Sequence, residues 1–75
     1  MITKGELKSL GYYTDNGYEF YDVNGPQSMY NIREQSLYEY CEINGIGKKL
    51  AVVKTLEELI ELYYAIFNEI LENNE

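Results

Sequence analysis

Three Asn-Gly pairs divide the middle of the chain, and they constrain its fold more than any other feature. They are Asn16-Gly17, Asn24-Gly25 and Asn44-Gly45. Asn-Gly favours the type I′ turns of β-hairpins, because both residues tolerate a positive φ. The residues around these pairs are rich in Tyr and Val, as half-buried strands tend to be. The sequence therefore predicts an antiparallel meander over residues 12–54.

The turn signals place four to five strands in this meander. The expected strands are residues 12–14, 18–23, 28–33, 37–43 and 49–54. Pro26 marks the end of the second strand, because proline cannot donate to a ladder. Alternation in the fourth strand predicts an aliphatic face with Leu37 and Cys41, and an opposite face with Tyr38 and Tyr40. Cys41 is therefore expected to be a small core residue.

Both ends of the chain carry helix signals. Thr3 with Glu6, and Thr55 with Glu58, each have the spacing of a capping box. Gly11 is the natural residue to follow the first, short helix. In the second helix the apolar residues fall in one wide arc. That arc comprises Leu56, Leu59, Ile60, Tyr63, Tyr64, Ile66, Phe67, Ile70 and Leu71.

These signals predict one α+β domain that spans residues 1–75. It begins with a short N-terminal helix and continues as an antiparallel meander of four to five strands. A long amphipathic C-terminal helix then packs on one face of the sheet. The hydrophobic fraction of 45% is ample for such a globular core and excludes a disordered chain.

The rare residue types limit the chemistry of the chain. It has one Cys and no His, so it cannot form an internal disulfide or the common structural zinc sites. General-base chemistry would rest on Lys or paired carboxylates, and no spacing singles out a pair. We therefore expect no catalytic residue, no metal site and no cofactor. With no signal peptide and no long apolar run, we expect a cytoplasmic protein that does not bind membranes.

The charge of the chain is concentrated at its C-terminal end. Residues 1–54 hold seven acidic and six basic residues, whereas residues 55–75 hold six Glu and no base. The net charge of -7 disfavours direct binding of nucleic acid, which relies on Lys and Arg. An uncompensated acidic helix face is either complementary to a basic protein surface or an ordinary solvated face that keeps a small protein soluble. The predicted partner-binding carboxylates are Glu57, Glu61, Glu69 and Glu72.

Tyrosine is over-represented, with nine Tyr against two Phe. A pure core favours residues that bring no hydroxyl to satisfy, whereas Tyr suits interfaces that are apolar on one side and wet on the other. A chain of 75 residues cannot bury nine Tyr completely, so several are expected at the surface. Tyr38 and Tyr40, on the expected tyrosine-bearing face, are the predicted anchors for a partner.

Two segments carry a resemblance to known proteins. Residues 3–12 read Thr-Lys-Gly-Glu-Leu-Lys-Ser-Leu-Gly-Tyr, and residues 55–63 read Thr-Leu-Glu-Glu-Leu-Ile-Glu-Leu-Tyr. Residues 3–12 resemble the opening of many small phage and prophage proteins, and residues 55–63 are similar to the final helix of such proteins. The resemblance implies an accessory role, such as inhibition of a host defence nuclease inside a bacterial cell. It carries over no functional residue.

Taken with the charge and the tyrosines, these features predict a non-enzymatic protein-binding module. Its partner would be a basic nucleic-acid-binding host protein, such as a CRISPR or other defence nuclease. A homo-oligomeric structural or assembly protein, for instance a homodimer, is one alternative, because small domains often gain stability by associating. A small ligand-binding protein is another. Concentration-dependent melting would favour the first alternative, and saturable stabilisation by a metabolite would favour the second.

Overall fold

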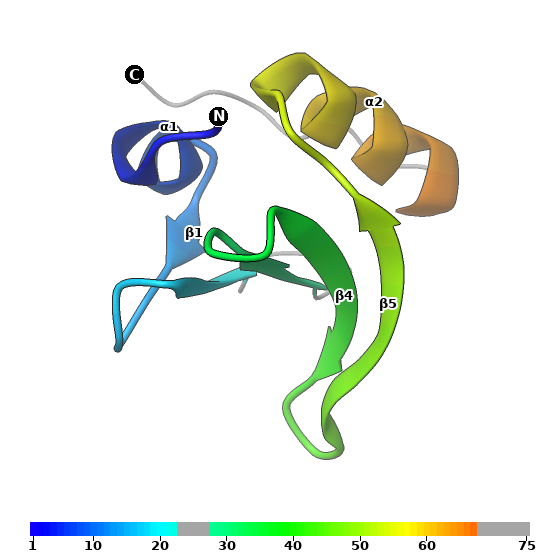
Figure 1. Ribbon diagram of the computed structural model, residues 1–75. Coiled ribbons are helices and arrows are strands. Elements are labelled where there is room, and N and C mark those ends of the chain that lie inside the picture. Colours follow the sequence, from blue (N-terminus) through cyan, green and yellow to red (C-terminus); the bar gives the residue numbers. More distant parts are fainter. Residues whose placement is uncertain (23–27, 68–75) are drawn as a thin grey trace.

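The chain folds as an antiparallel sheet with one helix before it and one helix after it (Figure 1). The computed structural model describes residues 1–22 and 28–67. Its elements are α1 (Lys4–Ser9), β1 (Tyr12–Tyr13), β2 (Glu19–Asp22), β3 (Ser28–Asn31), β4 (Ser36–Cys41), β5 (Gly45–Val52) and α2 (Leu56–Phe67). The strand order in the sheet is the order in the chain. The predicted α+β class and the antiparallel meander are therefore confirmed.

The N-terminal helix forms for the local reasons that the sequence predicts. The Thr3 hydroxyl accepts from the Glu6 amide, and the Glu6 carboxylate accepts from the Thr3 amide, which completes the capping box. Gly11 follows the helix with a φ of 96°, a conformation that L side chains rarely adopt. Ile2 and Leu7 are both buried in the core, so the short helix is stabilised by packing as well as by its cap.

The Asn-Gly turns differ from the prediction in type. Gly17 and Gly45 have a positive φ, but neither Asn16 nor Asn44 does, so these are not type I′ turns. The Asn16 side chain explains the first case, because its Oδ1 atom accepts from the Tyr18 and Glu19 amides at 3.1 and 2.9 Å. Asn16 thus closes the loop with its side chain rather than with its backbone. Asn24-Gly25 and Pro26 lie outside the described residues.

In the β4–β5 hairpin, β4 ends earlier than predicted and β5 begins earlier, and Figure 1 shows that the hairpin is curved. The tight turn at Gly45 lets β5 begin there and not at residue 49. The pairing shifts between Leu37 and Tyr38 and again between Tyr38 and Tyr40, as β-bulges do. Gly47 permits this close approach, since a Cβ atom at that position would lie 3.0 Å from the Glu39 Cβ atom.

These shifts end the predicted aliphatic face of β4. Leu37 is buried, but Cys41 is only half-buried at the end of the strand, and Ile43 at the tip of the hairpin is 92% exposed. The expectation that Cys41 is a core residue is therefore wrong. The reason is that β4 and β5 extend beyond the shorter strands, so neither described helix lies against their far ends.

The core lies between one face of the sheet and the two helices, and we call this face the covered face. Its strands contribute Phe20, Tyr30 and Leu37, which are paired across β2, β3 and β4. Leu7 of α1 and Leu59 of α2 belong to the same buried cluster. The C-terminal helix therefore packs on one sheet face, as the amphipathic pattern predicts.

The buried stripe of α2 is narrower than the predicted arc. Thr55 and Glu58 form the expected side-chain cap, and Leu59 and Tyr63 are fully buried. Tyr64 and Ile66, which the pattern assigned to the apolar side, are exposed. The part of the predicted helix beyond residue 67 lies outside the described residues. No helix in the described ranges is long and apolar enough to cross a membrane.

Candidate functional site

The predicted anchors and the predicted carboxylates lie on different sides of the sheet. Glu57 and Glu61 are exposed on α2, which packs on the covered face. Tyr38 pairs with Met29 across β3 and β4, whereas the adjacent positions Tyr30 and Leu37 pair on the covered face. Because alternate residues point to opposite faces, Tyr38 faces away from both helices. The structure therefore does not bring the two predicted groups together.

The remaining predicted site residues are placed as follows. Tyr40 lies on the same face as Tyr38, because its ring meets the ring of Tyr21 with centroids 4.7 Å apart. Tyr21 in turn pairs with Met29 across β2 and β3. Glu69 and Glu72 lie outside the described residues.

The face of the sheet away from the helices carries a cluster of tyrosines. We call Tyr13, Tyr21, Tyr38 and Tyr40 the open-face tyrosines. The strand register joins them, because Tyr13 pairs with Tyr21, Tyr21 with Met29, and Met29 with Tyr38. Met29 at the centre of this set is only 2% exposed, although neither described helix covers this face. Tyr13 at the edge strand is 49% exposed.

Three of the open-face tyrosines donate their hydroxyl protons to carboxylates. Tyr13 donates to Asp15 and Tyr38 to Glu34, and Tyr21 donates to Glu19 over a longer 3.4 Å. Asp15 and Glu34 are exposed at the surface. Each pair presents an aromatic ring next to a negative charge.

The carboxylates also hold these tyrosines in the neutral form. The hydrogen bond to Asp15 raises the pKa of Tyr13, and the hydrogen bond to Glu34 raises the pKa of Tyr38. For Tyr21, burial raises the pKa first and the charge of Glu19 adds to it. The physical cause is that a carboxylate accepts from a phenol but repels a phenolate. The surface therefore keeps its hydroxyl donors throughout the neutral range.

The tyrosines of the covered face have different partners. The Tyr12 hydroxyl meets Ser28 Oγ at 3.0 Å, and the Tyr30 hydroxyl donates to the Val53 carbonyl. These bonds satisfy buried hydroxyls and join segments that are far apart in the chain. Burial raises the pKa of Tyr30 to about 12 and raises the pKa of Tyr12 further. These tyrosines serve the fold, and they leave no hydroxyl for a partner.

One cationic side chain of the described residues contacts an aromatic ring. The Arg33 guanidinium lies 4.0 Å from the centroid of the Tyr18 ring, which is the geometry of a cation–π contact. Lys49 pairs with Tyr38 across β4 and β5, on the open face. Rings flanked by carboxylates can thus receive Lys and Arg in two ways, over the ring face and at the carboxylate.

The described residues contain no group of three or more Cys, Asp or Glu side chains that could hold a metal ion. Cys41 is half-buried at the end of β4.

Sequence reasoning missed Tyr13, Tyr21 and all three carboxylate partners. The sequence carried a signal for two of the three tyrosine–carboxylate pairs. Tyr13 and Asp15, and likewise Glu19 and Tyr21, are two residues apart, the spacing that places side chains on one face of a strand. The pairing of Glu34 with Tyr38 depends on the turn between β3 and β4, and no periodicity predicts it.

The fold and the open face define a small α+β domain with a sheet covered by helices on one side. In comparisons with protein families, with curated proteins and with solved structures, no match was found.

Proposed function

We propose that the chain is a non-enzymatic protein-binding module, whose partner presents a basic surface to the open-face tyrosines. The observation that carries this proposal is the set of three tyrosine–carboxylate pairs on a sheet face that neither described helix covers. Tyrosines anchor interfaces because they combine a large apolar ring with one hydrogen-bonding group. The neighbouring carboxylates make that anchor selective for Lys and Arg.

The charge of the whole chain supports the same partner chemistry. A net charge of -7 speeds the approach of a basic protein and repels acidic ones. Glu57 and Glu61 on α2, together with the predicted Glu69 and Glu72, would add to this attraction over longer distances. In this proposal the helix carboxylates steer the partner, and the tyrosine face contacts it.

In its narrower form, the proposal is that the chain is an accessory protein of a phage or mobile element. It would inhibit a nucleic-acid-binding host protein by occupying the basic surface that otherwise holds phosphates. The resemblance of residues 3–12 and 55–63 to small phage proteins, together with the acidic charge, supports this form. A defence nuclease such as a CRISPR effector is a partner of this kind.

The test compares two variants that each lose two negative charges. One is the open-face pair Asp15→Asn with Glu34→Gln, and the other is the helix pair Glu57→Gln with Glu61→Gln. Each is used, beside the unchanged chain, to capture proteins from a bacterial lysate with and without added duplex DNA. We expect the unchanged chain to retain a basic nucleic-acid-binding protein that DNA displaces.

The two variants separate contact from steering. We expect the open-face pair to lose the partner and the helix pair to keep most of it. Loss with the helix pair alone would move the docking surface to α2. The proposal would be contradicted if both variants retained the partner, or if the added DNA displaced none of the captured proteins. Capture of further copies of the chain alone would favour the homo-oligomer.

A further inference from the structure

A row of side chains crosses the open face from one edge of the sheet to the other. Its members are paired in register on neighbouring strands, in the order Tyr13, Tyr21, Met29, Tyr38 and Lys49. We call them the open-face row. Neighbouring strands lie about 4.8 Å apart, so each end of the row lies about 10 Å from Met29 at its centre. The row therefore has a tyrosine at one end and a lysine at the other, each two strands from the centre.

The two ends of the open-face row have complementary chemistry. Tyr13 is 49% exposed and donates its hydroxyl proton to the exposed Asp15 carboxylate, so a ring and a negative charge lie together. Lys49 is exposed at the other end, and within the described residues no ion pair involves Asp15 or Lys49. A lysine can bind a ring beside a carboxylate over the ring face and at the carboxylate at once. Each end of the row therefore matches the other end of a second copy.

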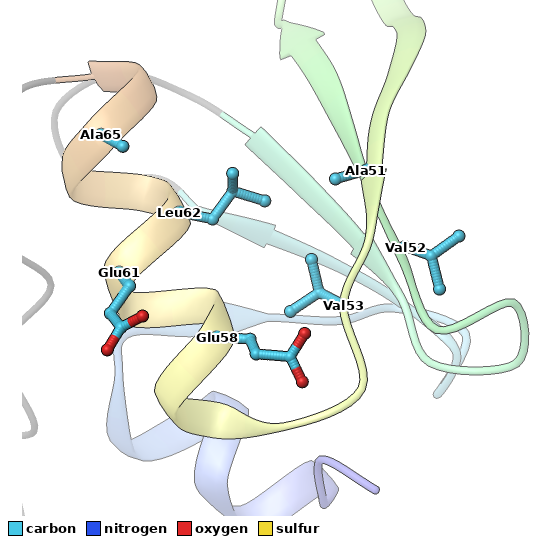
Figure 2. Close-up of a pocket in the computed structure, with 7 residues that line it drawn as sticks. All are labelled: Ala51, Val52, Val53, Glu58, Glu61, Leu62 and Ala65. Carbon is cyan, nitrogen blue, oxygen red and sulfur yellow. The ribbon is translucent and has the colours of Figure 1, made fainter.

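Exposed apolar side chains lie beside Lys49 on the same face. Ile46 pairs with the open-face residue Tyr40 and is 42% exposed. Val52 is 54% exposed, and Figure 2 shows its side chain on the opposite side of the strand from Val53, which belongs to the buried core. Contact with a second surface would remove this apolar area from water.

We infer that the open faces of two copies meet in a symmetric dimer, whose two-fold axis runs along the strands through Met29. Such an axis reverses the open-face row of the second copy. Lys49 of each copy then lies on the Tyr13 ring and the Asp15 carboxylate of the other, and the tyrosines between the two ends meet. Both charged contacts form together, because the axis repeats each of them.

The second copy follows from the spacing of the row as well as from its charges. An unrelated protein would need a cation and a ring beside a carboxylate about 19 Å apart and in the reverse order. A second copy has this arrangement already. The dimer should be weak and reversible, because one face of a small sheet is small for a protein interface.

The acidic excess of the chain lies mostly away from this interface. Residues 1–54 hold seven acidic and six basic residues. Glu57, Glu58 and Glu61 are exposed on α2, which packs on the covered face. The repulsion between two acidic chains is therefore weaker when they approach through their open faces than through their helices.

The dimer goes beyond the proposed function, and its consequence for binding rests on that function. The second copy occupies the same open-face tyrosines that the proposed function assigns to a basic partner. Dimerisation would therefore compete with partner binding. The dimer itself is measured on the pure chain, so it can be tested without any partner.

The test is sedimentation equilibrium of the full chain at increasing concentrations, starting from a monomer mass of 8.8 kDa. Two variants alter the charged contact, Lys49→Glu and Asp15→Lys. Lys48→Glu is the matched control, because Lys48 is exposed on the same strand but lies outside the open-face row. Backbone amide NMR checks that each variant is folded.

We expect the unchanged chain and Lys48→Glu to approach twice the monomer mass. Lys49→Glu and Asp15→Lys should each raise the dissociation constant by about tenfold or more, because both contacts then join like charges. An equimolar mixture of these two variants should dimerise again. In the mixed dimer each of the two contacts joins a lysine to a carboxylate.

Three results would overturn the inference. They are an unchanged chain that stays monomeric, equal effects of Lys48→Glu and Lys49→Glu, or a mixture of Lys49→Glu and Asp15→Lys that stays monomeric. Dimerisation without capture of a basic partner would support the dimer and contradict the proposed function. Capture of a basic partner by a chain that stays monomeric would do the reverse.

Discussion

The two faces of the sheet use the same residue type in opposite ways. On the covered side, Tyr30 of β3 and Tyr63 of α2 are fully buried, and their hydroxyls bond to the Val53 carbonyl and to Asp22. On the open face, Tyr13 and Tyr38 bond to carboxylates only two and four residues away. Long-range bonds tie the fold together, whereas local ones merely orient a ring at the surface. The excess of tyrosine thus has two separate causes.

Replacing a tyrosine by alanine should give the largest difference between the two faces in the free energy of unfolding. We expect Tyr30→Ala to lower the free energy of unfolding by about 3–5 kcal/mol, because it leaves a cavity beside Phe20 and Leu37. Tyr38→Ala should cost about 1 kcal/mol or less, since its ring is only half-buried and solvent can fill the space. Urea unfolding measures both. Equal losses would show that the open face belongs to the core.

Removing a tyrosine hydroxyl should also destabilise the protein more on the covered side than on the open face, but by a smaller amount. Tyr63→Phe takes a donor from the buried Asp22 carboxylate, which should cost about 1–3 kcal/mol. Tyr38→Phe takes a donor from exposed Glu34, where water replaces it, so the change should stay within about 0.5 kcal/mol. Thermal melts of the two variants test this. A Tyr38→Phe effect as large as that of Tyr63→Phe would contradict it.

Alkaline pH should lower the free energy of unfolding through a buried tyrosine of the covered face. Tyr30 has a folded pKa of about 12, above the ordinary 10, so the folded state holds its proton more tightly than the unfolded state. Its contribution is fully present below about pH 10 and is lost as pH rises toward 12, at up to about 1.4 kcal/mol per pH unit. Urea unfolding across this range checks the slope. A slope that Tyr30→Phe leaves unchanged would assign the effect to other groups.

The smallest expected effect lies in the turn that joins β3 and β4. Gln35 has a φ of 53°, and it stands between Glu34, the partner of Tyr38, and buried Ser36. Gln35→Gly should relieve the strained backbone and raise stability by up to about 1 kcal/mol, reduced by the greater freedom of the unfolded chain. Chemical denaturation measures the gain. A clear loss would mean that the half-buried Gln35 side chain contributes more than the strain costs.

Local features of the fold were predictable, and features that depend on distant contacts were not. Spacing within a few residues predicts the capping box at Thr3, the side-chain cap at Thr55, the residue Gly11 after α1 and the meander. The turn type at Asn16 depends on which way its side chain bonds, and the faces of β4 depend on bulges against β5. Neither the turn type nor the bulges can be predicted from the periodicity of a single strand.

The candidate site was likewise predictable only in part. The sequence predicts that Tyr38 and Tyr40 share one face of the sheet, and the structure places both on the open face. The sequence could not show that α2, with Glu57 and Glu61, lies on the other side of the sheet. A helix with one apolar stripe can cover either face, and only the alternation of Tyr30 and Leu37 against Tyr38 decides which one.

The central claim is that the open-face tyrosines serve binding and not folding. The most direct test is the double variant Tyr13→Ser with Tyr38→Ser, compared with Tyr64→Ser on α2, whose ring is 51% exposed against 49% for Tyr13. Partner capture and urea unfolding are measured on the same preparations. We predict that the double variant stays folded and loses the basic partner, while Tyr64→Ser keeps it. A folded double variant that captures the partner as well as the unchanged chain would contradict the claim.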